Sequence, residues 1–402
     1  MIHKLSFSNF YSFADENEIS FVVPEHAKTK WYTKTKTGVR VTKALGAFGA
    51  NGSGKTNALR VGAFLGWFIE KSFLAGGPEA RIPVHNFLFT KTLKEGVHLG
   101  ADFEIEGVLY SYSLIVSVKQ VLHESLKAKK HSDSKFSTLF KRDWNKDLNK
   151  YKVDFKKYNA PKDLEKVMRK NASIISAGAQ IEHPLSEKIR QFWMNVSSNV
   201  SMLGKQHFSD GQTLASAKFF HENKKLKKKA EDLLCRFDLG LSGIKIEKQK
   251  AFSEDKKEEK EVIVPFGIHS VGGKDFPLII FEESGGTKSL FVVLQVVLSV
   301  LERGGVAILD EFDSDMHPDM IPELVNLFSS KIHNPHNAQL LFSTHHPQIL
   351  NELEKYQVLL AEKDEETAKS EIWRLDEQEG RPDVNYYKKY ISGAYGATPN
   401  IK

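Results

Sequence analysis

Short apolar runs near both ends of the chain predict the strands of a parallel sheet. Residues 44–48, 305–309 and 339–342 are apolar at nearly every position, and each run gives way to polar residues or glycine. A strand needs such a continuous run when helices cover both of its faces. Longer apolar stretches at residues 58–65 and 289–301 have the length of helices. The pattern therefore predicts an α/β fold at the two ends of the chain.

Alternation of apolar and polar residues predicts antiparallel strands in the first third of the chain. Residues 2–10 and 18–23 are expected to form an opening hairpin, and residues 101–110 and 111–116 a second antiparallel pair. Residues 84–89 are expected to be extended and half buried. In the second pair, the side chains expected to face the core are Phe103, Ile105 and Val108, and those expected to face water are Asp102, Glu104 and Glu106.

The middle of the chain has a different character. Residues 162–175, 185–196 and 215–237 suit helices, and no heptad persists long enough for a coiled-coil arm. Residues 253–261 carry mixed charge without an apolar period, so we expect an exposed loop there. The predicted division is the N-terminal half of a domain at residues 1–126, a mainly helical basic insertion at 127–261, and the C-terminal half of that domain at 262–402.

The composition is that of an ordinary globular protein. The chain has 402 residues, 41% hydrophobic and 27% charged, which is enough for two or three domains with a substantial core. Residues 1–6 lack the apolar core of a signal peptide, and the apolar run at 290–301 is too short to cross a bilayer. We therefore expect a cytoplasmic protein with no membrane partner. Cys235 is the only cysteine, which excludes an internal disulfide and favours a buried thiol.

Positive charge is concentrated in one region. The net charge is +6, but residues 119–171 contain sixteen Lys or Arg against seven Asp or Glu. This region is either a surface for nucleic acid or an acidic partner, or a solvated surface rich in lysine. Residues 224–229 form a second concentrated positive face on a predicted helix.

The strand at residues 44–48 leads into a motif that fits G-x-x-x-x-G-K-[ST] at every fixed position. Its glycines let successive backbone N–H groups turn towards a polyphosphate, and the positive end of the next helix points at the same anion. Lys55 is expected to bridge the β- and γ-phosphates, and Thr56 to offer its hydroxyl to Mg²⁺. The residues expected to contact nucleotide here are Gly49, Asn51, Gly52, Ser53, Gly54, Lys55, Thr56 and Asn57.

A second stretch has the properties of an anion-binding helix end. Ser284, Gly285 and Gly286 precede the apolar helix at residues 289–301, so their hydroxyl and N–H groups are expected to face a phosphate. Taken alone, this stretch more often forms a plain N-cap turn. Its position shortly before a strand that ends in two carboxylates favours the phosphate-binding interpretation.

The polar residues after the later apolar strands predict the remaining chemistry of the site. Asp310 and Glu311 follow one strand, at the edge where parallel sheets bind ligands. Asp310 suits the Mg²⁺ shell, and Glu311 suits the base that deprotonates an attacking water. His345 follows the next strand and can bond the γ-phosphate or that water, whereas its neighbour His346 suits a structural role. For either histidine alone, a capping or core role is the simpler expectation.

These motifs, in this order, resemble those of ABC-type ATPase heads: Walker A at 49–56, a signature variant at 284–287, Walker B at 306–311 and a switch histidine at 345. The chain as a whole resembles the bacterial AAA15/AAA21 group of these ATPases, which is related to OLD-family proteins and to Rad50 and SMC heads. Segments 9–13, 310–318 and 390–399 also look like signatures of this group. Glu283 and Thr287 depart from the usual signature, and no glutamine can be assigned to the Q-loop.

The resemblance implies an ABC-type P-loop ATPase head with an N-terminal antiparallel portion and an inserted, mainly helical lobe. It further implies two heads that close over ATP and Mg²⁺, with Ser284 and Gly286 of one head touching the γ-phosphate held by the other. Only 57 residues follow His345, too few for the nuclease domain of OLD-family nucleases. The expected role is an ATPase sensor or scaffold for a separate effector, a nuclease or toxin, in phage defence. The alternative is a DNA-maintenance ATPase resembling RecF or Rad50.

Overall fold

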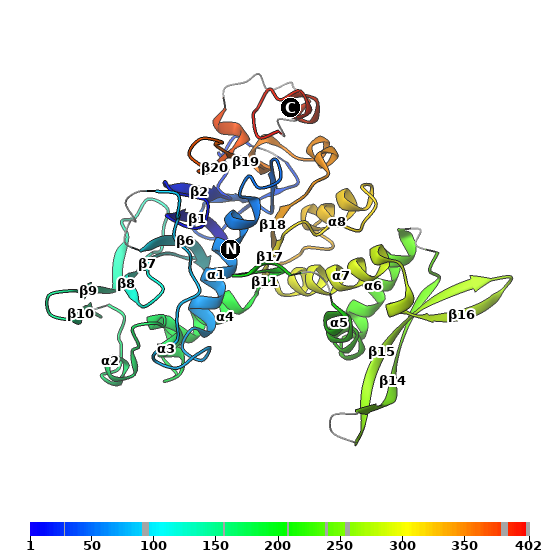
Figure 1. The fold of residues 1–402 in the computed structure, drawn as a ribbon, viewed down its shortest axis with the longest axis horizontal. Coiled ribbons are helices and arrows are strands. Elements are labelled where there is room, and N and C mark those ends of the chain that lie inside the picture. Colours follow the sequence, from blue (N-terminus) through cyan, green and yellow to red (C-terminus); the bar gives the residue numbers. More distant parts are fainter. Residues whose placement is uncertain are drawn as a thin grey trace.

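The computed structural model describes residues 1–27, 29–90, 96–155, 157–206, 209–237, 240–253, 258–378 and 385–398. Two sheets dominate its architecture, a mostly parallel one at the centre and an antiparallel one beside it (Figure 1). Helices and a smaller three-stranded sheet extend from the opposite side of the parallel sheet (Figure 1). The mixed α/β fold expected from the sequence is confirmed.

The central sheet has the strand order β11-β17-β18-β5-β19-β20. Its strands pair in parallel except for the edge strand β20, which is antiparallel to β19. The strands are β5 (Ala44–Phe48), β11 (Val196–Ser198), β17 (Val306–Leu309), β18 (Gln339–Ser343), β19 (Val358–Lys363) and β20 (Ser370–Arg374). The three predicted apolar runs thus become the adjacent strands β17, β18 and β5.

Burial on both faces explains why these strands are apolar throughout. In β17, Val306 and Ile308 belong to one hydrophobic core, and Ala307 and Leu309 belong to another. Successive side chains of a strand point to opposite faces, so a strand that separates two cores can leave no position polar. All residues of β5, β17 and β18 are buried.

The antiparallel sheet has the order β10-β9-β8-β7-β6-β1-β2, and it contains both predicted antiparallel pairs. Helix α1 (Lys55–Lys71) contacts β1 and β6 of this sheet and β17 and β18 of the central sheet. Gly62 of α1 leaves no space for a Cβ, which would clash with Ile308. The strands are β1 (Ile2–Ser8), β2 (Asn17–Ser20), β6 (Val97–Ile105), β7 (Val108–Val116), β8 (Val121–Lys129), β9 (Ser137–Asn145) and β10 (Lys150–Asp154).

The other face of the central sheet is covered by α7 (Gly285–Arg303) and α8 (Met320–Ser329). Helix α7 is long and apolar enough to cross a membrane by length and composition, but 67% of its most apolar window is buried inside the protein. Its side chains pack with Leu309 and Phe342 in the second core. The sequence of α7 is therefore apolar because the helix is buried, as is typical of a core helix in a globular protein.

The remaining helices and short strands lie mainly in the middle of the chain. The helices are α2 (Asp163–Val167), α3 (Ile174–Ala179), α4 (Pro184–Met194), α5 (Asp210–Glu222), α6 (Lys224–Arg236) and α9 (Tyr386–Ile391), with 3-10 turns at Ile280–Glu282, Pro347–Asn351, Lys355–Gln357 and Leu375–Glu377. The strands are β3 (Tyr32–Lys34), β4 (Arg40–Thr42), β12 (Val200–Ser201), β13 (Gly204–Lys205), β14 (Gly243–Ser253), β15 (Glu258–Val271) and β16 (Lys274–Ile279). Residues 126 and 261, where we divided the chain, fall inside β8 and β15, and the domain boundaries stay a prediction.

Four local expectations differ from the structure. Residues 162–175 do not form one helix but contain α2 and the start of α3. Residues 84–89 form no strand, although Val84 and Phe87 are buried. Glu104 does not face water, because the neighbouring β3–β4 ribbon covers it, and its carboxylate accepts hydrogen bonds from the N–H and hydroxyl of Thr37. Residues 254–257 of the predicted loop lie outside the described residues, and residues 258–261 belong to strand β15.

Several lysines of α6 are paired with carboxylates. Lys225 and Lys229 both form ion pairs with Glu302 of α7, and Lys228 pairs with Glu231 on its own helix. These pairs are partly exposed, so each contributes at most about 1 kcal/mol to stability. They nevertheless leave less unpaired positive charge on α6 than the sequence suggests.

A fully buried ion pair joins the antiparallel sheet to α3. Arg142 of β9 and Glu124 of β8 are both inaccessible to solvent, and their nitrogen and oxygen lie 2.6 Å apart. Glu124 also accepts hydrogen bonds from the Tyr112 hydroxyl, the Ser173 hydroxyl and the backbone N–H of Ile174, where α3 begins. The pair therefore fixes the start of α3 on the sheet.

The sheet β14-β15-β16, here called the arm, extends away from the two main sheets (Figure 1). Its last strand, β16, leads through a single 3-10 turn into Glu283 and Ser284 at the start of α7. His269 of β15 bonds the Glu283 carboxylate at 2.8 Å, and this carboxylate is 7% exposed. Glu283, which departs from the usual signature, thus connects the arm to the turn at Ser284.

Candidate active site

The loop between β5 and α1 has the backbone geometry that its glycines permit. Gly49, Gly52 and Gly54 have φ angles of 154°, 76° and 111°, in the range that L side chains rarely adopt. A Cβ on Gly49 would overlap the carbonyl oxygen of Ala361, and one on Gly54 would lie 2.7 Å from the Ser370 hydroxyl oxygen. Glycine is therefore required at Gly49 and Gly54 both by the backbone φ angle and by the lack of room for a Cβ atom.

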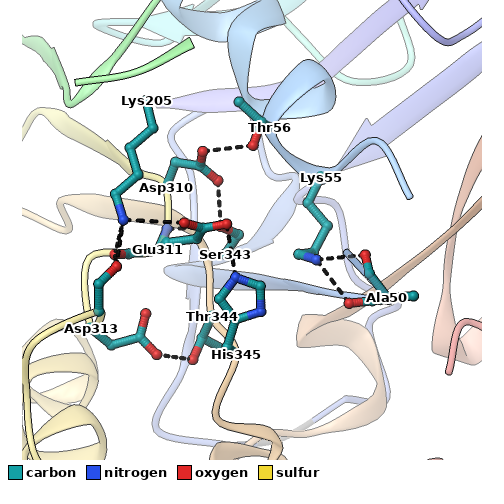
Figure 2. A network of polar contacts seen from close by, with 12 residues as sticks. Ala50, Lys55, Thr56, Lys205, Asp310, Glu311, Asp313, Ser343, Thr344 and His345 are labelled. Carbon is teal, nitrogen blue, oxygen red and sulfur yellow. Dashed lines mark hydrogen bonds and ion pairs between the residues drawn. The ribbon is translucent and has the colours of Figure 1, made fainter. Parts of the chain in front are cut away.

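Lys55 begins α1 and folds back onto the loop. Its ammonium donates hydrogen bonds to the carbonyl oxygens of Gly49 and Ala50 at 2.8 and 3.0 Å (Figure 2). Burial lowers the pKa of Lys55, and the nearby carboxylates of Glu311 and Asp310 oppose this shift. Two carbonyl oxygens replace only part of the hydration of an ammonium, so a polyphosphate is a stronger partner for this group than the contacts it makes here.

Thr56 and Asp310 meet across the sheet edge. The Thr56 hydroxyl donates to Asp310 Oδ2 at 2.7 Å, and the Ser343 hydroxyl donates to Asp310 Oδ1 (Figure 2). Asp310 is fully buried, and its backbone N–H and carbonyl are both bonded by the side chain of Asn199. A hydroxyl and a carboxylate oxygen are ligands that Mg²⁺ prefers, so these two residues fit the metal position expected from the sequence.

Glu311 points towards His345. The two side chains lie 2.8 Å apart between Glu311 Oε1 and His345 Nε2 (Figure 2). Glu311 has a φ angle of 41°, an uncommon conformation for this residue type, and its N–H donates to the Ser343 hydroxyl. Burial raises the pKa of Glu311, but hydrogen bonds from His345 and Lys205 outweigh burial and leave that pKa below its ordinary value. The carboxylate is therefore ionised at neutral pH, as a base must be.

His346 has different neighbours from those of His345. Its Nε2 lies 3.8 Å from Asp313 Oδ2, and the Thr344 hydroxyl donates to the same oxygen. Asp313 is 1% exposed, and burial raises its pKa. His346 therefore contacts Asp313 where His345 contacts Glu311, and its structural role stays a prediction.

Most of these groups line one pocket of about 360 Å³, whereas the predicted site residues Gly49 and Asp310 are not part of its lining. Its lining comprises Asn51, Gly52, Ser53, Gly54, Lys55, Thr56, Asn57, Glu311 and His345. Asn57 also lines the pocket. Its side chain accepts a hydrogen bond from Arg60 on the same helix and donates one to the Ser12 hydroxyl, which joins α1 to the segment after β1. The glycine loop, the two oxygen ligands and the ionised carboxylate together fit a magnesium-bound nucleoside triphosphate.

The turn at Ser284 does not line this pocket. Helix α7 runs antiparallel to β17, to which it is joined through Gly304, so its first turn lies at the sheet edge that carries Asp310. The Ser284 hydroxyl accepts a hydrogen bond from Thr287 N–H at 3.1 Å and also bonds the Thr287 hydroxyl. The hydroxyl thus caps α7, the form that this turn most often takes when considered alone, and its contact with a phosphate stays a prediction. Gly286 packs against the backbone of Asp315, in the loop after β17.

A family model described as "AAA domain, putative AbiEii toxin, Type IV TA system" matches residues 48–351, about three quarters of the chain. The chain belongs to this family. The prediction of the AAA21 group of ATPases is thereby confirmed, and the match covers the glycine loop, the turn at Ser284, Asp310, Glu311 and His345.

Solved structures of SMC heads are similar to this AAA21-family chain at low sequence identity. An SMC head bound to the C-winged helix domain of ScpA has 12% identity over 92% of this chain and 96% of that chain, with a TM-score of 0.47. The SMC head domain from Thermotoga maritima has 14% identity over 93% and 98%, with a TM-score of 0.44. The SMC head with a coiled coil and joint from Pyrococcus yayanosii has 10% identity over 98% and 99%, with a TM-score of 0.44. No curated protein matches the sequence.

Sequence reasoning missed three residues of the site in this family member. Asn199 and Ser343 hold Asp310, and Lys205 contacts Glu311. Asn199 and Lys205 lie more than one hundred positions before the carboxylates, in a stretch without any motif. Ser343 is the last residue of β18, which pairs with β17. The sequence signal that could have found it was the expectation that these two strands are neighbours, which brings Ser343 beside Asp310.

Proposed function

We propose that this protein is an ABC-type ATP hydrolase that binds ATP with Mg²⁺ in the 360 Å³ pocket and closes as a dimer around it. The observation that carries the proposal is that Thr56, Glu311 and His345 line the same pocket as the glycine loop, with Asp310 bonded to Thr56. A structural turn would need neither an ionised base nor a pair of magnesium ligands beside it.

Each group has a role that follows from its position. The loop N–H groups and Lys55 bind the phosphates, with Lys55 exchanging its two carbonyl partners for phosphate oxygens. Thr56 and Asp310 would hold Mg²⁺, which would supply positive charge to stabilise the phosphates. Glu311 takes the proton of the attacking water, and His345 orients the Glu311 carboxylate and contacts the γ-phosphate.

The dimer part of the proposal explains the turn at Ser284. A helix N-terminus with two glycines suits a phosphate, yet this turn is absent from the lining of the pocket in its own chain. In a face-to-face pair of heads, Ser284, Gly285 and Gly286 of each chain would contact the nucleotide held by the other. Nucleotide then stabilises the dimer, because it binds the closed state better than the open state.

We expect Lys55→Ala to weaken the binding of ATP at least about tenfold, because the variant loses a charge-assisted contact to the phosphates. Isothermal titration with MgATP measures the affinity. Lys71→Ala is the matched control, since Lys71 lies on the same helix with its side chain 53% exposed. Equal affinity of Lys55→Ala and the wild type would contradict the nucleotide site.

We expect the wild type to dimerise when MgATP is added, and Ser284→Arg to bind ATP but stay monomeric. The long cationic side chain would obstruct the partner's phosphate pocket while leaving the variant's own pocket intact. Sedimentation velocity with and without MgATP measures the association. A wild type that binds ATP and remains monomeric would rule out the shared site, and so would a Ser284→Arg variant that dimerises normally.

The finer role that we propose is that of a sensor or scaffold for a separate effector in phage defence. The support is the resemblance to the AAA15/AAA21 group and the description of the matching family, which names a toxin and a toxin–antitoxin system. The test is the plating efficiency of phage on cells that carry the gene with its neighbours, compared with cells in which Lys55 is replaced by Ala. Protection that does not need Lys55 would contradict an ATP-dependent role.

The alternative of a DNA-maintenance ATPase receives no specific support from the described residues. Several cations of the basic region at 119–171 are already paired: Lys141 with Asp143, Lys166 with Asp163, and Lys170 with Glu79. Arg142 is buried with Glu124. These pairs lower the positive potential that a phosphate backbone would meet. A DNA affinity that falls steeply between low and moderate salt would support this alternative.

A further inference from the structure

Lys205 directs all three of its N–H donors into the candidate active site. Its ammonium donates to the Glu311 carbonyl at 3.0 Å, to Glu311 Oε2 at 3.2 Å and to the Ser314 hydroxyl (Figure 2). An ammonium has three donors and no acceptor, so these contacts use its full capacity. The Lys205 side chain is 14% exposed, which excludes the free rotation of a surface lysine.

The segment that carries Lys205 is itself fixed against α1 and against Tyr11 near the N-terminus. The β12–β13 hairpin packs on α1, and the Tyr11 hydroxyl donates to the Met202 carbonyl at 2.7 Å. At the base of the hairpin, Asn199 bonds both backbone groups of Asp310, and its own carbonyl accepts the N–H of Gln206. The position of Lys205 is therefore set by the same elements that hold Asp310.

Glu311 needs such support, because its backbone is in a left-handed conformation that is uncommon for glutamate. Contacts to both its carbonyl and its carboxylate fix the residue from backbone to side-chain end. His345 holds the other carboxylate oxygen at 2.8 Å. One oxygen of the Glu311 carboxylate thus bonds the Lys205 ammonium, and the other bonds the His345 imidazole.

We propose that Lys205 is a positioning residue for ATP hydrolysis: its contacts hold the Glu311 carboxylate in the orientation that a base requires. This inference rests on the proposed function, because it assigns Lys205 a role through Glu311. The charged and titratable groups that face the carboxylate are Lys205 from β13, His345 after β18, Lys55 at the start of α1 and Asp310 beside it in the chain. Of these, Lys205 is the cation in hydrogen-bond contact.

The experiment compares steady-state hydrolysis of MgATP by the wild type and four variants. For Lys205→Met we expect kcat to fall about tenfold or more, with KM and the affinity for a non-hydrolysable ATP analogue within about twofold of the wild type. Lys205→Gln should lower kcat likewise, whereas Lys205→Arg keeps a charged donor at this position and should recover most of the wild-type kcat.

Lys225→Met is the matched control, since it removes a lysine that pairs with Glu302 far from the pocket, and it should leave kcat unchanged. Thermal unfolding of each variant shows whether the fold is retained. Values of kcat within about twofold of the wild type for both Lys205→Met and Lys205→Gln would overturn the proposal. A tenfold loss of analogue affinity would also overturn it, because Lys205 would then be a phosphate ligand. Failure of the wild type to hydrolyse ATP would overturn the proposed function and this inference together. Normal hydrolysis by the wild type and by the Lys205 variants would overturn this inference alone.

Discussion

Glu311→Gln should lower kcat for ATP hydrolysis by a factor of about 10² to 10⁴ and leave the affinity for MgATP unchanged. Gln has the shape of Glu but cannot take a proton from water at neutral pH. Its amide oxygen can still accept from Lys205 and its amide NH₂ can face His345, so the site stays assembled around a residue that no longer acts as a base.

The same variant should accumulate as an ATP-bound dimer, because closure no longer ends in hydrolysis. Phosphate release measures the turnover, and sedimentation velocity with MgATP measures the dimer. Glu352→Gln is the control, since Glu352 is exposed and does not line the pocket. Hydrolysis by Glu311→Gln at the wild-type rate would remove Glu311 from its proposed role while leaving the nucleotide pocket unaffected.

The largest expected loss of stability follows from breaking the buried pair of Glu124 and Arg142. Arg142→Met leaves an unpaired carboxylate without access to solvent, and we expect it to lower the free energy of unfolding by about 3–5 kcal/mol. Glu124→Gln should have a similar effect, since it leaves the guanidinium uncompensated. Urea unfolding followed by circular dichroism measures the change.

The neighbouring pair of Lys141 and Asp143 provides the matched control. It lies on the same strand as Arg142, but its side chains are 49% and 40% exposed. Lys141→Met should therefore change the free energy of unfolding by no more than about 1 kcal/mol. Equal effects of Lys141→Met and Arg142→Met would mean that burial does not determine the strength of these pairs.

The sequence predicted well those features that depend on local pattern. The strand β17 had to be apolar throughout because Val306 and Ala307 face different cores, and the glycine loop had to contain Gly49 because no side chain fits beside Ala361. Both constraints appear within a few residues of sequence. The strand ends that carry Asp310 and His345 followed from the rule that parallel strands present their carboxyl ends at one edge.

Features that depend on distant segments were not predictable in this way. Glu104 alternates as an outward residue should, yet a ribbon from residues 32–42 covers it. Lys205 reaches Glu311 across 106 positions, and a single lysine in a polar stretch carries no signal of its partner.

The connection between the arm and Glu283 has a mechanical consequence. The arm enters α7 through β16 and also touches its start through His269, so two linkages bring any displacement of the arm to the same few residues. A protein that bound and tilted the arm would therefore displace the turn at Ser284. Such a protein would regulate the proposed closure of the heads from a surface remote from the nucleotide.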